Sequence, residues 1–78
     1  MATMAQAKRD FQAAYLKGFY VVADIVPGCW NLDIEDINGR RGFLVDARTK
    51  EPRSFKTLDA AVSALREIGF DVKGLVSA

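Results

Sequence analysis

The fold of this 78-residue chain is decided by residues 30–45, WNLDIEDINGRRGFLV. Apolar and polar residues alternate along its first half, which is typical of a strand with one buried face. Asn38-Gly39 is the pair most typical of a two-residue hairpin turn. A turn at this pair places Ile34 opposite Phe43, and each apolar residue on the inner face of the first strand then meets an apolar residue of the second strand. The segment therefore predicts a β-hairpin at the centre of the fold.

The preceding stretch, residues 19–26, reads FYVVADIV and is rich in β-branched and aromatic residues. This composition favours a strand, although a first helix that continues to about Ala23 also fits. If Pro27-Gly28 forms a two-residue connection, Ala23 lies opposite Leu32, and apolar residues again face apolar residues.

Two further segments carry helical patterns. Apolar residues recur at steps of three and four from Met4 to Tyr15, and Gly18 is expected to end that helix. Near the C-terminus, Thr57 has the position of an N-cap before an apolar stripe that continues to Ile68. Gly69 then has the position of a C-terminal stop.

Together these patterns predict a single α+β domain over residues 1–78. We expect two layers. One is an antiparallel meander of three or four strands, and the other consists of an N-terminal helix and a C-terminal helix packed on this sheet. The order is α-β-β-β-(β)-α. A short fourth strand is expected around Arg53–Lys56. Residues 70–76 form either a last strand or a docked tail.

The composition argues against catalysis and metal binding. Histidine is absent and Cys29 is the only cysteine. These facts exclude Ser-His and Cys-His nucleophile pairs, His-containing metal sites and thiolate zinc sites. We expect no catalytic residue, no metal and no cofactor, and the chain is predicted not to be an enzyme.

Charge is divided along the chain. Residues 24–39 hold four acidic and no basic residues, whereas residues 40–56 hold six basic and two acidic ones. Arginine in the basic segment suits recognition of phosphate or carboxylate. The candidate contacts to nucleic acid or to an acidic partner are Arg40, Arg41, Arg48, Lys50, Arg53 and Lys56.

The acidic group consists of Asp33, Glu35 and Asp36. Asp33 and Glu35 share one face of their strand, and Asp36 is expected to pair with Arg41 across the hairpin. This group is either a solvated face that opposes edge-to-edge association or a contact for a cation or a basic partner.

A third candidate surface is apolar. The predicted register directs Tyr20, Val22 and Leu44 to the face opposite the core. Such a patch is typical of an interface. Either a second copy of the chain or another protein binds it, or the N-terminal helix covers it.

The sequence also predicts where the protein is found. Its longest apolar run is too short to span a bilayer, and charged residues interrupt the N-terminal segment. A single cysteine suits a reducing compartment. We therefore expect a cytoplasmic protein without membrane contact.

Residues 18–24, GFYVVAD, and 55–62, FKTLDAAV, are similar to small ParC-like accessory proteins of plasmids and other mobile elements. The resemblance implies a role in plasmid maintenance or in modulating a host system, and no functional residue is carried over from it. We expect a non-enzymatic accessory or regulatory protein that binds a protein partner. The alternative is a nucleic-acid-binding module that uses residues 40–56.

Overall fold

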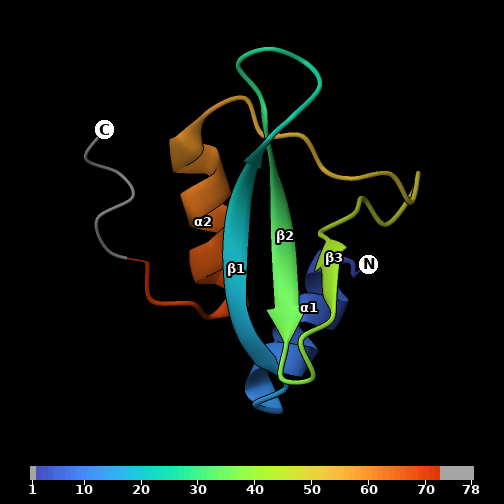
Figure 1. Ribbon diagram of the computed structural model, residues 1–78, viewed down its shortest axis with the longest axis vertical. Helices are drawn as coiled ribbons and strands as arrows, with labels where there is room; N and C mark the ends of the chain where they lie inside the picture. The colour runs from blue at the N-terminus through green and yellow to red at the C-terminus, as the bar shows by residue number, and fades with distance from the viewer. Residues whose placement is uncertain (1, 73–78) are drawn as a thin grey trace.

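The structure is a computed structural model that describes residues 2–72, and its fold is the predicted α+β arrangement (Figure 1). The three strands form one antiparallel sheet in the order β1-β2-β3. The elements are α1 (Met4–Gln12), β1 (Leu16–Ala23), β2 (Trp30–Asp36), β3 (Arg41–Phe43) and α2 (Leu58–Ile68).

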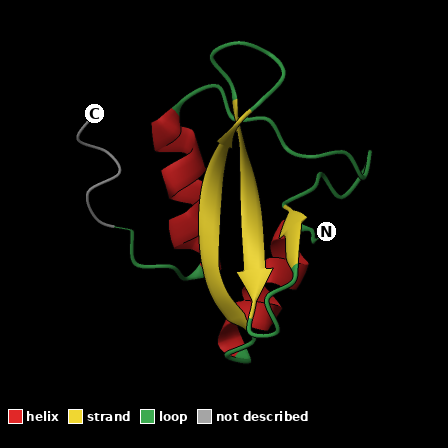
Figure 2. Ribbon diagram, in the orientation of Figure 1, coloured by secondary structure: helices red, strands yellow, loops and turns green. Residues whose placement is uncertain are grey.

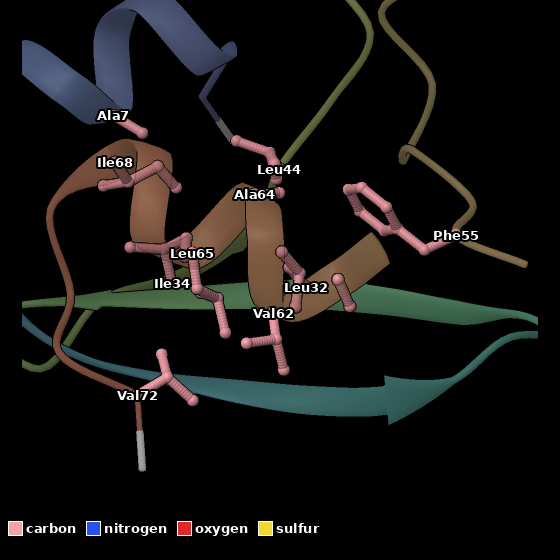
Figure 3. Packing of buried hydrophobic residues seen from close by; sticks show 11 residues of the cluster. Ala7, Leu32, Ile34, Leu44, Phe55, Val62, Ala64, Leu65, Ile68 and Val72 are labelled. Carbon is pink, nitrogen blue, oxygen red and sulfur yellow. The ribbon is translucent and has the colours of Figure 1, made fainter. Parts of the chain in front are cut away.

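Both helices lie on the same side of the sheet, so the molecule has two layers (Figures 2 and 3). The core lies between these layers, where α2 packs over Leu32 and Ile34 of β2. Ala7 of α1 is buried above Ile68 at the end of α2 (Figure 3). The opposite face of the sheet carries no helix among the described residues.

The first helix is shorter than the sequence pattern predicts. Thr3 caps it reciprocally with Gln6, since each side chain accepts from the other residue's backbone N–H. The helix ends at Gln12, and Ala14 takes a left-handed conformation with φ 58°. The prediction that Gly18 ends this helix is therefore wrong, because Gly18 lies within β1.

Residues 16–23 form a strand, so the alternative of a first helix reaching Ala23 is wrong. The predicted two-residue connection at Pro27-Gly28 is also wrong, because six residues join β1 to β2. Pro27-Gly28 forms an inner turn in which Cys29 N–H donates to Val26 O at 3.2 Å and Gly28 has φ 82°. The observed register of β1 against β2 differs by two residues from the predicted one, so Ala23 lies opposite Trp30 instead of Leu32. A shift of two leaves every side chain on its predicted face.

The central hairpin exists, but its loop has three residues, Ile37–Gly39, instead of two. Gly39 N–H donates to Asp36 O at 3.0 Å, and Asp36 N–H donates to Arg40 O at 2.9 Å. Gly39 has φ 82°, as the last residue of a three-residue hairpin loop commonly requires. The predicted register is wrong by one residue, so Ile34 faces Gly42.

The shift of one residue moves Leu44 to the other face of the sheet. Leu44 is fully buried in the core, where its N–H donates to Leu32 O at 2.8 Å. The prediction that Leu44 shares an outward patch with Tyr20 and Val22 is therefore wrong.

The chain after β3 forms isolated pairings instead of a fourth strand within the described residues. Trp30 and Phe55 exchange two backbone hydrogen bonds of 2.8 Å, so residue 55 continues the sheet beyond β3 at the start of β2. Between β3 and Phe55, residues 46–51 form a loop. It is closed by Asp46 N–H, which donates to Glu51 O at 2.8 Å. The expected strand at 53–56 is reduced to this single pair.

The second helix begins and ends as predicted. The Thr57 hydroxyl accepts from Ala60 N–H at 3.0 Å, and Gly69 N–H donates to Leu65 O at 3.1 Å. Gly69 has φ 134°, and an added Cβ there would lie 2.5 Å from the Phe11 ring. The close approach of α1 to the end of α2 thus requires glycine.

Phe70–Val72 form no strand, and residues 73–76 of the predicted last strand lie outside the described residues. Among residues 2–72 no helix is long and apolar enough to cross a membrane.

Candidate functional site

The face of the sheet turned away from the helices is the candidate functional site, and we call it the open face. Side chains reach it from alternate positions of all three strands. They are Tyr20 and Val22 of β1, Asn31, Asp33 and Glu35 of β2, and Arg41 and Phe43 of β3.

A charged cluster occupies one half of the open face. Arg41 donates to Asp33 Oδ2 through Nε at 2.8 Å and lies 2.6 Å from it through Nη2. The Arg41 guanidinium also stacks 3.9 Å above the centre of the Tyr20 ring. The Tyr20 hydroxyl donates to Glu35 Oε1 at 2.9 Å. Four side chains from three strands thus form one connected network.

Electrostatics within the network act on Tyr20. The pKa of Tyr20 is raised, first because its hydroxyl donates to the Glu35 carboxylate and next because the Glu35 charge disfavours the phenolate. Tyr20 therefore keeps its proton, and its role as donor to Glu35, to a higher pH than an isolated tyrosine does. Its ring remains 43% exposed beneath the Arg41 guanidinium.

Asp33 is only 8% exposed, although no helix within residues 2–72 covers it. Neighbouring side chains bury it, and Arg41 binds only its Oδ2 atom. Among residues 2–72, no group donates to the buried Oδ1 atom. Arg41 is therefore the described side chain that offsets the burial of the Asp33 carboxylate.

An apolar groove of about 450 Å³ lies in the other half of the open face. Strand residues line its floor, and two residues from each flanking loop line its walls. The floor residues are Val22, Ala23, Asn31 and Phe43, and the wall residues are Asp24, Ile25, Glu51 and Pro52. Ile25 stands on one wall with 97% of its surface exposed, and Pro52 lies on the other. This volume is within the usual range of binding pockets.

The groove walls are fixed by hydrogen bonds between segments distant in sequence. Ser54 donates to Asp24 Oδ2 at 2.6 Å, which joins the 24–29 connection to the segment before α2. Asn31, buried in the floor, donates from Nδ2 to Arg53 O at 2.8 Å. The groove is therefore a built feature of the fold.

Three aspartates each accept hydrogen bonds that hold a loop or turn in place. The pKa of Asp24 is lowered, chiefly because Ser54 donates to its carboxylate. The pKa of Asp46 is lowered because the backbone N–H groups of Arg48 and Thr49 donate to it.

Desolvation acts to raise the pKa of Asp36. The pKa is nevertheless lowered, because the backbone N–H groups of Arg40 and Asn38 donate to its carboxylate and together outweigh desolvation. Asp36 is thus a turn residue, and the prediction that it pairs with Arg41 is wrong. Arg41 lies opposite Glu35 and binds Asp33, because of the one-residue register shift.

The six predicted basic contacts do not come together on one surface. Arg40 and Arg41 lie by the hairpin turn, whereas Arg48 and Lys50 lie in the 46–51 loop on the far side of β3 (Figure 1). Arg53 stacks 5.0 Å from the centre of the Phe55 ring, and Lys56 is exposed just before α2.

The predicted acidic face is found only in part. Asp33 and Glu35 do share the open face, as expected from strand alternation. In the described part of the chain, no group of three His, Cys, Asp or Glu residues has the geometry to hold a metal ion. Cys29 is half-buried, and its thiol forms no disulfide.

Two parts of the site were not predicted from the sequence. The Asp33–Arg41 pair depends on the three-residue hairpin loop, and the groove depends on how the 24–29 and 46–53 loops fold back. Ile25 and Val26, two apolar residues directly before a Pro-Gly turn, are the signal that points to an exposed apolar loop.

Comparisons of the chain with protein-family models, curated proteins and solved structures find no match.

Proposed function

We propose that this chain is a small, non-enzymatic accessory protein that binds another protein through the open face. The observation that carries the proposal is the apolar groove beside the Arg41–Tyr20–Asp33 cluster. Tyrosine and arginine next to apolar surface are the residues enriched at protein interfaces and at their strongest contacts.

The chemistry of the groove indicates what the partner presents. Its floor is apolar, while Asp24 and Glu51 add carboxylates to its walls. Asp33 and Glu35 extend the negative charge toward the hairpin turn. The matching ligand is a protein segment with an apolar side chain for the groove and a lysine or arginine beside it.

The resemblance to ParC-like proteins suggests where such a partner is found. It would be encoded on the same plasmid or mobile element, or belong to the host system that the element modulates. A nucleic-acid-binding module that uses residues 40–56 is the second candidate. Arg41, however, is already paired with Asp33, and the open face carries carboxylates that repel phosphate.

The test uses one residue on the groove wall and a matched control elsewhere. Ile25→Asp places a charge in the groove at a 97% exposed position, so the fold is retained. Ile37→Asp makes the same change at the hairpin turn, where Ile37 is 58% exposed. A partner captured from the source cells is purified, and its affinity for the three proteins is measured by calorimetry.

We expect Ile25→Asp to weaken binding about tenfold or more, since a charge then replaces an apolar contact. Ile37→Asp should bind as the parent does. Equal affinities of both variants would place the partner elsewhere on the molecule. Binding of mixed DNA or RNA that weakens steeply with salt, and is lost in Arg48→Gln/Lys50→Gln, would favour the nucleic-acid module instead.

A further inference from the structure

The outer edge of β1 carries unpaired backbone groups. Asp24 N–H donates to Cys29 O at 2.9 Å, and pairing continues in the same register through Val22–Asn31 and on down the strand. Hydrogen-bonded and non-hydrogen-bonded pairs alternate in an antiparallel ladder. The N–H and C=O groups of Phe19, Val21 and Ala23 therefore point away from β2. No backbone hydrogen bond to this edge is formed by residues 2–72.

The opposite edge of the sheet is covered from Phe43 onward. Ala2 N–H donates to Phe43 O at 3.2 Å, and Val45 N–H donates to Ala2 O at 2.8 Å. Just beyond, Arg53 N–H donates to Leu44 O at 2.9 Å. Among residues 2–72, the β1 edge therefore has the longer stretch without backbone partners. Two copies that pair through this edge form a closed dimer and do not grow into a fibre.

Features that normally protect a strand edge are confined to the beginning of β1. Lys17 and the register irregularity between Leu16 and Gly18 both lie there, and both discourage pairing with another strand. Residues 19–23, FYVVA, contain no charge and no proline. This half of the edge is left open to a further strand.

We propose that a second copy of the chain pairs with this edge, antiparallel, with a two-fold axis at Val21. The dimer then has one continuous six-stranded sheet. This register sets Phe19 opposite Ala23 of the second copy on the core face. On the open face, it sets Tyr20 opposite Val22 of the second copy, an aromatic and β-branched pair that stabilises antiparallel sheets.

Self-complementarity is what selects a second copy as the occupant. Every residue from 19 to 23 meets an apolar residue, and Lys17 is left outside the paired stretch. The inference goes beyond the proposed function, because it uses the backbone edge of β1, although the side chains of Val22 and Ala23 also line the groove. Partner binding to the open face is measured by calorimetry, and dimerisation is measured by sedimentation. Failure of the binding proposal and failure of the dimer proposal can therefore be told apart.

The test compares two substitutions at the exposed residue Ala23. Ala23→Pro removes an outward N–H and leaves the β1–β2 ladder intact, because proline is tolerated where a strand donor faces outward. Ala23→Thr retains the N–H and is the matched control. Sedimentation velocity over a series of concentrations measures the dimer in each protein.

We expect the parent and Ala23→Thr to dimerise weakly as concentration rises, because the interface is small. In Ala23→Pro, two intermolecular hydrogen bonds are lost, and the dissociation constant should rise about tenfold or more. A parent that is monomeric at every concentration would overturn the proposal. Equal dimerisation of the proline and threonine variants would do the same.

Hydrogen exchange of the parent gives a second readout that needs no substitution. The amides of Phe19, Val21 and Ala23 should exchange more slowly as the concentration rises, while the Val22 amide, paired within the molecule, should not change. This measurement decides the question if Ala23→Pro unfolds. Outward amides whose exchange is the same at all concentrations would rule out pairing at this edge.

Discussion

The two faces of β2 are buried to a similar extent but by different means. On the core face, Leu32 and Ile34 are 0% and 6% exposed beneath α2. On the open face, Asn31 and Asp33 are each 8% exposed, although no described helix covers them. Apolar contacts bury the first pair. In the second pair each residue makes a polar contact: Asn31 donates to the Arg53 backbone carbonyl, and Asp33 accepts from the Arg41 side chain.

This difference separates stability from recognition. Burial of apolar surface is non-directional and supplies most of the stability of a small domain. Polar pairs such as Arg41–Asp33 add little net stability, but they hold side chains in defined positions. The core face thus stabilises the sheet, while the open face presents an ordered surface to a partner.

The largest expected effect is on the core face. Leu32→Ala removes a fully buried side chain and leaves a cavity under α2, so it should cost about 2–5 kcal/mol of the free energy of unfolding. Val22→Ala, on the half-buried open face, should cost less than about 1.5 kcal/mol. Urea unfolding followed by Trp30 fluorescence measures both. Equal losses would mean that both faces are packed as core.

A smaller effect is expected within the charged cluster. Arg41→Met leaves the Asp33 carboxylate buried without a partner and should cost about 1–3 kcal/mol. Half of the Arg41 side chain is exposed, which keeps the cost toward the lower end. The double variant Arg41→Met/Asp33→Asn should recover part of the loss, because no charge is then stranded. Additive losses in this double-mutant cycle would show that the two residues are not coupled.

The smallest effect is expected in the two loops and the hairpin turn that contain Asp24, Asp36 and Asp46. Asp24, Asp36 and Asp46 have a folded-state pKa lowered from 3.8. Their stabilisation is complete above the unfolded pKa and is lost as the pH falls through the folded pKa. Stability should therefore decline from about pH 4 downward. Thermal unfolding at several pH values should show a shallower decline for Asp46→Asn, and identical curves would exclude this role for Asp46.

Local patterns predicted the helix over residues 58–68 with both of its ends. Thr57 and Gly69 act within one turn of the chain, so neighbouring residues suffice to place them. The existence of the central hairpin was predicted for the same reason. The strand expected over residues 19–26 exists, but it runs from Leu16 to Ala23. Its start was missed because α1 ends before Ala14, and its end was missed because residues 24–29 form a loop.

The candidate site was predicted only in part. Tyr20, Val22, Asp33 and Glu35 do share one face, since strand alternation alone decides this. Leu44 was misplaced and Phe43 was missed, because a loop of three residues instead of two inverts every side chain of β3. Ile25 and Pro52 were missed as groove walls, since they meet through loops that contain no regular pattern.

By itself, the sequence determined the type and order of the elements, and it determined the absence of histidine chemistry. These follow from local preferences and from composition. Only the tertiary structure decided the register of β3, the pairing of Arg41 with Asp33, and which edge of the sheet stays open. Each depends on contacts between residues distant in the chain, whose energies differ little between alternative registers until α2 and the loops pack against the sheet.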